Sequence, residues 1–399
     1  MIMKQVGITK NILDISNWRN YIKKHMHFLE IENEFFFKEI MQTLKQKEPI
    51  VSANSIDNLT VSLSNLQVEN GFILQVGECA ESFDSFSEAD ILQKIEMMLD
   101  LANIFNNKNI IKIGRIAGQY NKPRSEYFET KNNTTLPQYF GDMINEFYFN
   151  EVNRKLDPKR MLLAYDFSHK TYAIILQFLN KNPKENLFIS HEALNLFYEE
   201  AMTKKINNKH YNTSAHMLWL GNRTRFIGSA HIEYLKLIEN PIGIKISNST
   251  TIHDTIEIIK QLNPKNIAGK IILINRMGAK NTKVYLQSYI KAIKESGLSV
   301  LWIIDPMHGN TIKLSNGLKT RFFTDIIQEI KDFVSILKDN KVYFAGIHLE
   351  STYLDNTECA FSNSDDVENF VKQKYLANCD PRLNYTQSKE IINLLKTLI

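Results

Sequence analysis

The chain has 399 residues, of which 43% are hydrophobic and 23% charged, and its 48 Lys and Arg against 44 Asp and Glu give a formal net charge of +4. This composition is that of a globular protein, which excludes a largely disordered chain, and the small, dispersed positive excess argues against a nucleic-acid binder. No apolar run approaches the roughly 20 residues that span a bilayer, and the start lacks a secretory signal, so we expect a cytoplasmic protein without membrane association.

The first 70 residues predict a helical N-terminal extension. Apolar residues recur at helical spacing over residues 15–22 and again at Phe35, Phe36 and Ile40. Because no repeat and no Pro/Gly-rich linker marks a boundary, we divide the chain only into this extension, residues 1–70, and one catalytic domain, residues 71–399.

Beyond residue 70, short apolar runs alternate with longer amphipathic segments. Such continuous runs are typical of strands buried on both faces of a parallel sheet. The expected strands are 71–78, 109–115, 214–223, 241–247, 269–276, 298–305, 341–350 and 374–380. Eight units of alternating strand and helix favour an α/β fold, a (β/α)₈ TIM barrel, with a doubly wound open sheet as the alternative. Two further segments, 160–165 and 185–190, also have strand character and leave the count open.

Two helices are predicted near the C-terminus. Residues 323–340 place Ile326, Ile330, Phe333 and Leu337 on one face, and the last helix is expected to begin with Thr386 as its N-cap.

A side chain suited to binding anions or metals ends or closely follows each predicted strand. In a barrel, the carboxyl ends of the strands meet at one face. Four cations there would need a multiply anionic substrate, and a mixture of one soft, one borderline and two hard donors suits a divalent transition metal better than Ca²⁺. The residues are Cys79, Arg115, Arg223, Lys245, Arg276, His308, Glu350 and Asp380.

Two loops add polar groups to this set. The segment GRIAGQYNKPRSE, residues 114–126, combines glycines with Lys122, Arg124 and Ser125, and DPMHGNT, residues 305–311, surrounds a glycine turn with Asp, His and Asn. The simpler interpretations are an exposed basic loop and an ordinary βα turn.

Taken together, these motifs resemble the type II (plant-type) 3-deoxy-D-arabino-heptulosonate 7-phosphate (DAHP) synthases. The resemblance runs from residue 77 to residue 384 in the order of the family. The stretches that carry it are GECAESF (77–83), GRIAGQYNKPRS (114–125), LPQYFGD (136–142), SHEAL (190–194), SAHMLWLGNRTR (214–225), HIEYL (231–235), NPIGIKI (240–246), RMGA (276–279), DPMHGNT (305–311), GIHLE (346–350) and CDPRLN (379–384).

The resemblance implies a TIM barrel in which 160–165 and 185–190 belong to a long insertion between barrel strands 2 and 3. It implies a divalent metal, Mn²⁺ or Co²⁺ before Fe²⁺ or Zn²⁺, held by Cys79, His308, Glu350 and Asp380. It implies that phosphoenolpyruvate is bound by Arg115, Asn222, Arg223, Lys245 and Arg276. It further implies that erythrose 4-phosphate is bound by Lys122, Arg124 and Ser125, with Arg115, Lys245 and His308 taking catalytic roles.

The implied reaction is a metal-dependent, aldol-like condensation of these two substrates to DAHP and phosphate. It is the first step of the shikimate pathway to aromatic amino acids, or of a secondary-metabolite version of that route. We expect a homo-oligomer, a dimer, with a chorismate mutase as a candidate partner. His348 is either a partner of the ligand set or a histidine of the core.

The sequence departs from the family pattern at a few positions. Asn222 stands where the family usually has an acid, Ser247 and Asn248 stand where it has Gly-Pro, and Val76 replaces a glycine. These departures keep two alternatives open: a related synthase acting on an amino or imino analogue of the acceptor, and a catalytically weak paralogue that serves as a binding partner.

Overall fold

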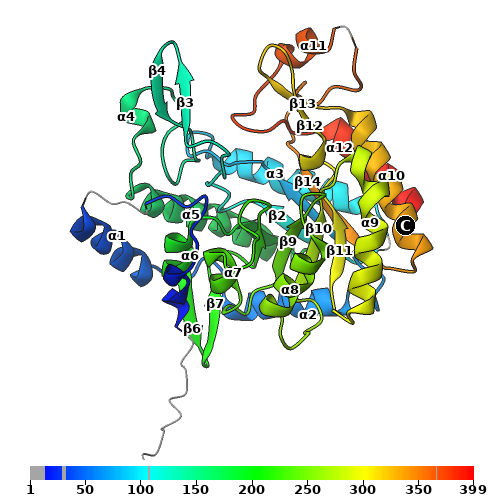
Figure 1. The fold of residues 1–399 in the computed structure, drawn as a ribbon, viewed down its shortest axis with the longest axis horizontal. Coiled ribbons are helices and arrows are strands. Elements are labelled where there is room, and N and C mark those ends of the chain that lie inside the picture. The colour runs from blue at the N-terminus through cyan, green and yellow to red at the C-terminus, as the bar shows by residue number, and fades with distance from the viewer. Residues whose placement is uncertain (1–13, 29–32, 107, 365) are drawn as a thin grey trace, which may run out of the picture.

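The computed structural model describes residues 14–28, 33–106, 108–364 and 366–399, and its centre is a closed barrel of eight parallel strands (Figure 1). This confirms the predicted (β/α)₈ fold and excludes the open sheet. In chain order the barrel strands are β1 (Phe72–Gly77), β2 (Ile110–Arg115), β5 (Phe188–Glu192), β8 (Met217–Leu220), β9 (Ile242–Ile246), β10 (Ile271–Asn275), β11 (Leu301–Ile304) and β14 (Phe344–Glu350), and β14 pairs with β1 to close the ring.

Side chains of each barrel strand alternate between the barrel interior and the helical layer. Ile73 packs inside the barrel, whereas its neighbour Leu74 packs outward against the helices. Helix α2 (Ala53–Asn65), capped by Ser52, contributes Leu59 and Leu63 to the interior cluster. This helix therefore closes the amino-terminal end of the barrel.

Eight helices follow the barrel strands along the chain. They are α3 (Glu88–Asn103), α5 (Arg160–Lys181), α6 (Leu196–Met202), α7 (Ala230–Leu235), α8 (Ile252–Leu262), α9 (Ala279–Glu295), α10 (Phe323–Asp339) and α12 (Tyr385–Leu398). The predicted helix over 323–340 is confirmed as α10. The predicted start of the last helix was two residues late, because Asn384 caps α12 and exchanges capping-box hydrogen bonds with Gln387.

Two predictions about the strands were wrong: one predicted strand is absent, and one segment assigned to the insertion is a barrel strand. The two errors cancel, so the number of barrel strands is still the predicted eight. Residues 374–380 form no strand: α11 (Val367–Gln373) ends just before them, and Leu376 is exposed. Residues 188–192 are the third barrel strand, since β5 pairs with β2 on one side and with β8 on the other. The insertion between barrel strands 2 and 3 is present, but it ends at residue 187 and includes residues 160–165 as the start of helix α5.

The described part of the N-terminal extension contains η1 (Ile15–Asn20), α1 (Glu34–Gln46) and the helix α2. Trp18 and Ile40 are buried as the periodicity predicted, whereas Phe35 is 72% exposed because α1 buries Phe37 instead. Within the predicted extension, residues 1–13 and 29–32 lie outside the described residues.

Within the described barrel domain, three hairpins and three short helical segments lie outside the barrel strands and the helices that follow them. Hairpins β3–β4 (Phe128–Lys131, Thr134–Pro137) and β12–β13 (Thr311–Lys313, Lys319–Arg321) rise at one end, and β6–β7 (Thr203–Ile206, Lys209–Asn212) projects at the other (Figure 1). The short segments are α4 (Glu151–Arg154), η2 (His308–Asn310) and α11. Across the described ranges, no helix has both the length and the hydrophobicity of a membrane span.

Candidate active site

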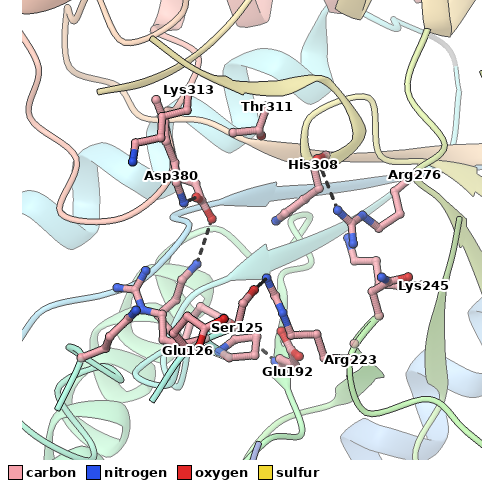
Figure 2. A pocket seen from close by; sticks show the side chains of 18 of the residues that line it. Ser125, Glu126, Glu192, Arg223, Lys245, Arg276, His308, Thr311, Lys313 and Asp380 are labelled. Atoms are coloured by element: carbon pink, nitrogen blue, oxygen red, sulfur yellow. Dashed lines mark hydrogen bonds and ion pairs between the residues drawn. The ribbon is translucent and has the colours of Figure 1, made fainter. Parts of the chain in front are cut away.

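A cavity of about 560 Å³ opens at the carboxyl ends of the barrel strands, beside the hairpins β3–β4 and β12–β13 (Figure 2). All of the residues that the sequence predicts for substrates and metal line it, except Cys79 and Glu350, which are buried beside it. The lining members are Arg115, Lys122, Arg124, Ser125, Asn222, Arg223, Lys245, Arg276, His308 and Asp380. The structure therefore brings the predicted set together, while the role of each residue stays a prediction.

Two buried cations, Arg115 and Lys245, converge on His348 at the inner end of the cavity. Arg115 ends β2 and its Nη1 lies 2.6 Å from His348 Nε2, while Lys245 Nζ on β9 lies 2.8 Å from the same nitrogen. His348 Nδ1 faces Gln75 Oε1 at 2.7 Å. These partners require that Nε2 accepts and that Nδ1–H donates, which is the tautomer of a neutral ring. His348 is thus a buried hydrogen-bonding partner of the cations.

Burial and the neighbouring charges determine the ionisation of His348 and Lys245. Burial, followed by Lys245 and Arg115, holds the pKa of His348 well below its usual value. Burial likewise lowers the pKa of Lys245 to about 8, and Arg115 adds to the effect, although Asp305 opposes it from 2.5 Å. Lys245 is therefore charged at neutral pH but loses its proton far more readily than an exposed lysine.

The four predicted metal ligands meet at one side of the cavity. Ligand atoms of Cys79, Glu350 and Asp380 lie within 4.8 Å of one another, and Cys79 Sγ is 3.4 Å from Asp380 Oδ2. His308 Nε2 is 3.0 Å from Glu350 Oε1. Cys79 follows β1, Glu350 ends β14 and His308 lies in η2, whereas Asp380 reaches the site from the loop before α12.

Cations already compensate the charge of this group. Lys122 Nζ lies 2.6 Å from Cys79 Sγ, and Arg321 Nη2 lies 2.6 Å from Glu350 Oε2. Although burial opposes it, His308 and Arg321 hold the pKa of Glu350 well below its usual range. Burial and the Glu350 carboxylate raise the pKa of the Cys79 thiol, so a thiolate here needs a nearby cation. Such a donor set fits a divalent transition metal.

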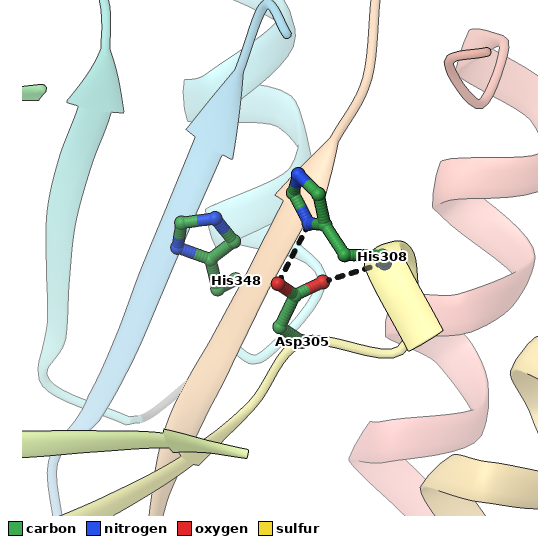
Figure 3. A group of neighbouring side chains, drawn as sticks. All are labelled: Asp305, His308 and His348. Atoms are coloured by element: carbon green, nitrogen blue, oxygen red, sulfur yellow. Dashed lines mark hydrogen bonds and ion pairs between the residues drawn. The ribbon is translucent and has the colours of Figure 1, made fainter. Parts of the chain in front are cut away.

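A second group of potential ligands contains Asp305, His308 and His348 (Figure 3). His348 is already engaged by the two buried cations, so its ring offers no free lone pair to a metal. Asp305 Oδ2 instead lies 2.7 Å from His308 Nδ1. A proton on Nδ1 leaves the Nε2 lone pair directed toward Glu350, which is how carboxylates orient metal-binding histidines.

At the outer rim, the loop over residues 114–126 meets the loop after β8. Arg223 Nη2 donates to Ser125 Oγ at 3.1 Å, and Arg124 Nε donates to Tyr139 O at 2.7 Å. Arg276 lies deeper and donates from Nη2 to His308 O, while its Nε has no partner among the described residues. These guanidinium groups leave donors free for an anion in the cavity.

Two departures from the family pattern contact each other in space. Ser247 Oγ donates to Asn222 Oδ1 at 2.9 Å, and Arg225 Nη2 donates to both side chains. Burial lowers the pKa of Arg225 to about 10. Since both hydrogen bonds occupy the Asn222 carbonyl oxygen, the amide nitrogen is the atom left for a ligand.

Sequence reasoning missed several residues of the site. Asp305 closes a predicted strand and could have been found from that position, and Glu192 was missed because its strand was assigned to the insertion. Arg321 carries no local signal, because its partner Glu350 lies 29 positions away on another element. Arg225 lies in the quoted stretch 214–225, but no local pattern indicates its contact with Ser247.

Comparison with known proteins agrees with this geometry. A family model described as the class-II DAHP synthetase family matches residues 13–185 and 179–396. A Streptomyces coelicolor protein named phospho-2-dehydro-3-deoxyheptonate aldolase is 35% identical over 411 residues, covering 90% of this chain and 91% of its own length. A Neurospora crassa protein of the same name is 36% identical, covering 88% and 87%. Phospho-2-dehydro-3-deoxyheptonate aldolase AroG of Mycolicibacterium smegmatis is 31% identical, covering 91% and 90%.

Proposed function

The chain belongs to the class-II DAHP synthetase family, and from this membership we propose that it condenses phosphoenolpyruvate with erythrose 4-phosphate to give DAHP and inorganic phosphate. The observation that carries the proposal is the convergence of free guanidinium and ammonium donors with four potential metal ligands in one cavity.

Phosphoenolpyruvate would bind at the inner end of the cavity. Arg115 and Lys245 would hold its carboxylate, and Arg223 and Arg276 its phosphate, through charge-assisted hydrogen bonds. Asn222 would add a neutral donor beside them. Because His348 accepts from both inner cations, it fixes their positions before substrate arrives, which lowers the reorganisation that binding requires.

Erythrose 4-phosphate would bind closer to the rim. The Arg124 guanidinium and the Ser125 hydroxyl would receive its phosphate, directing the aldehyde inward toward the ligand group. Lys122, which the resemblance assigned to this substrate, contacts Cys79 and Asp380, so we propose that it also balances the charge of the ligands.

The metal would be held by Cys79, His308, Glu350 and Asp380, with Asp305 orienting the His308 ring. A divalent cation there would act as a Lewis acid on the acceptor's aldehyde oxygen. We propose Mn²⁺ or Co²⁺, for which this mixed donor set is suited.

With both substrates bound, the buried cations would assist their condensation. The third carbon of phosphoenolpyruvate attacks the aldehyde carbon, water adds to the second carbon, and phosphate leaves. Arg115 and Lys245 would orient the donor and stabilise the negative charge that develops next to them, and the Lys245 ammonium is suited to donate a proton there.

The test is a phosphate-release assay on the purified chain with both substrates. We expect release that requires both substrates, is abolished by a chelator and is restored by Mn²⁺ or Co²⁺. Release only with an amino or imino analogue of erythrose 4-phosphate would instead support the altered-acceptor synthase. Failure of either substrate to bind in calorimetry would support the binding-partner role.

A further inference from the structure

A second cavity, of about 650 Å³, lies at the opposite end of the barrel from the candidate active site. It is formed by α2, the β6–β7 hairpin and the segments that lead into β9 and β10, and Figure 1 shows these elements gathered at that end. Part of its wall is aliphatic, and two of these wall residues, Val61 and Ile267, are 57% and 45% exposed. The aliphatic members are Val61, Leu237, Ile238, Leu262 and Ile267.

A buried lysine, Lys270, lines the same cavity. Lys270 is 7% exposed and directly precedes β10, and its Nζ donates to Ile238 O at 2.6 Å and to Asn240 O at 2.7 Å. An ammonium group has three N–H donors. Within the described ranges, Lys270 has no third hydrogen-bond acceptor and no carboxylate in ion-pair contact, so its charged form lacks a direct counterion.

The other charges around the cavity leave a positive excess. The cavity lining contains two carboxylates, Asp57 and Glu239, and both already have partners. Lys209 pairs with Glu239 at 3.6 Å, and Asp57 accepts a hydrogen bond from Tyr211 at 3.1 Å. Lys236 pairs with Glu233 outside the lining. In the described structure Lys205 and Lys265 have no carboxylate partner, so they add to the charge of Lys270.

We propose that this cavity binds a small aliphatic carboxylate, whose carboxylate group meets Lys270 and whose hydrocarbon body covers the aliphatic walls. Cavities of about 300–1,000 Å³ with apolar walls and a few polar groups are the usual form of small-molecule sites. An inorganic anion would satisfy the lysine but leave the walls exposed to water, and an aliphatic alcohol would leave the charge unpaired. The site is independent of the chemistry proposed at the other end of the barrel.

Calorimetric titration of the full chain with hexanoate and with its neutral counterpart hexanamide tests the proposal. We expect saturable one-to-one binding of hexanoate and at least tenfold weaker binding of hexanamide. Equal affinity for the two compounds, or no saturable binding of hexanoate, would overturn the proposal.

Two variants separate the site from general charge effects. Lys270→Met removes the cation, and Ile267→Glu introduces a negative charge into an exposed part of the wall, so folding is not at risk in the second variant. Each should weaken hexanoate binding at least tenfold, whereas Lys291→Met, which removes an exposed lysine from α9, should leave binding unchanged. Wild-type affinity in both folded site variants would exclude Lys270 and this wall.

Proton uptake gives a readout that a merely structural lysine would not. Burial lowers the pKa of Lys270 to about 7, Glu239 opposes this and Lys209 adds to it. The bound carboxylate should restore the proton, so at pH 7.5 the heat of binding should depend on the ionisation enthalpy of the buffer, and affinity should rise as pH falls from 8.5 to 6.5. The other facing groups are Asp57, His210, Glu239 and the remaining lysines. Burial lowers the pKa of His210, which favours its neutral form. Buffer-independent heat would contradict the assignment of the ligand to Lys270.

Discussion

Cys79 gives the clearest test of the ligand group at the scale of single residues. Its sulfur lies next to Lys122 and Asp380, and a thiolate binds Co²⁺ far more strongly than a serine hydroxyl does. Cys79→Ser should therefore weaken Co²⁺ binding at least tenfold and remove the sulfur-to-cobalt charge-transfer absorption. Cys359→Ser is the matched control, since Cys359 is buried equally well outside both potential metal groups. An unchanged absorption spectrum in Cys79→Ser would remove this residue from the site.

The lowered pKa of Lys245 leads us to expect that the binding of phosphoenolpyruvate depends on pH. Below its lowered pKa of about 8 the ammonium is present and can hold the phosphoenolpyruvate carboxylate, and above it the charge is lost. We therefore expect kcat/KM for phosphoenolpyruvate, which reports ionisations of the free enzyme, to fall with rising pH above about 8. Lys245→Arg keeps the charge, so any activity it retains should not show this fall. A wild-type profile that stays flat to pH 9.5 would contradict the prediction.

At the scale of elements, helix α10 connects the two loops that carry Arg276 and His308. Its buried Glu329 accepts from Gly278 N at 2.8 Å and from Asn310 Nδ2 at 2.7 Å, and Asn310 Oδ1 in turn accepts from Ala279 N. Burial raises the pKa of Glu329 to about 8. A positioning role follows, because this one carboxyl group joins the loops after β10 and β11.

Glu329→Gln tests that role. The amide nitrogen would face a backbone or side-chain donor, and such an unsatisfied buried pair should cost about 1–3 kcal/mol of unfolding free energy, measured by chemical denaturation. We also expect KM for phosphoenolpyruvate to rise more than kcat falls, since Arg276 would be less well positioned. Asp332→Asn, on the same helix but paired with Lys283, is the control. Loss of stability with an unchanged KM would make Glu329 purely structural.

Most of the barrel could be predicted because its strands carry a local signal. Seven of the runs predicted as strands coincide with barrel strands, since burial on both faces demands continuous apolar residues. The strand β5 was misassigned although residues 185–190 show strand character, because the family resemblance placed them in the insertion. Residues 374–380 were predicted as a strand from a few apolar residues that are not part of the barrel.

The candidate site was predictable only where its residues follow strands. Arg115 and Glu350 end strands, so topology alone brings them together. Asp380 reaches the cavity from a loop. It was included as the end of the predicted strand 374–380, which the structure does not contain, so only the family resemblance supported it correctly. The pairing of Arg321 with Glu350 depends on how a hairpin folds back over the barrel, which no local pattern encodes.

At the scale of the whole molecule, the ligand group joins the two ends of the barrel domain. Cys79 and Asp380 are separated by 301 positions along the chain, so an ion shared by them would bind the folded state and not the unfolded one. Free Co²⁺ at 100 times its dissociation constant should add about 2.7 kcal/mol of stability, and thus raise Tm relative to chelator-treated protein. The rise should be much smaller for Cys79→Ser. Equal Tm values with and without metal would argue against a resident ion.

Because helix α2 closes the amino-terminal end of the barrel, it also limits the route by which substrates can reach the candidate active site. Because α2 fills that end in the described structure, we expect both reactants and both products to pass through the opening beside the two hairpins. Arg115 and Lys245 are buried, whereas Arg124 is half-buried and Ser125 is exposed. An acceptor bound at Arg124 and Ser125 would therefore block access of the donor to the inner cations. We therefore expect phosphoenolpyruvate to bind first. Steady-state kinetics should then show an ordered mechanism, in which the sugar phosphate binds productively only after the donor.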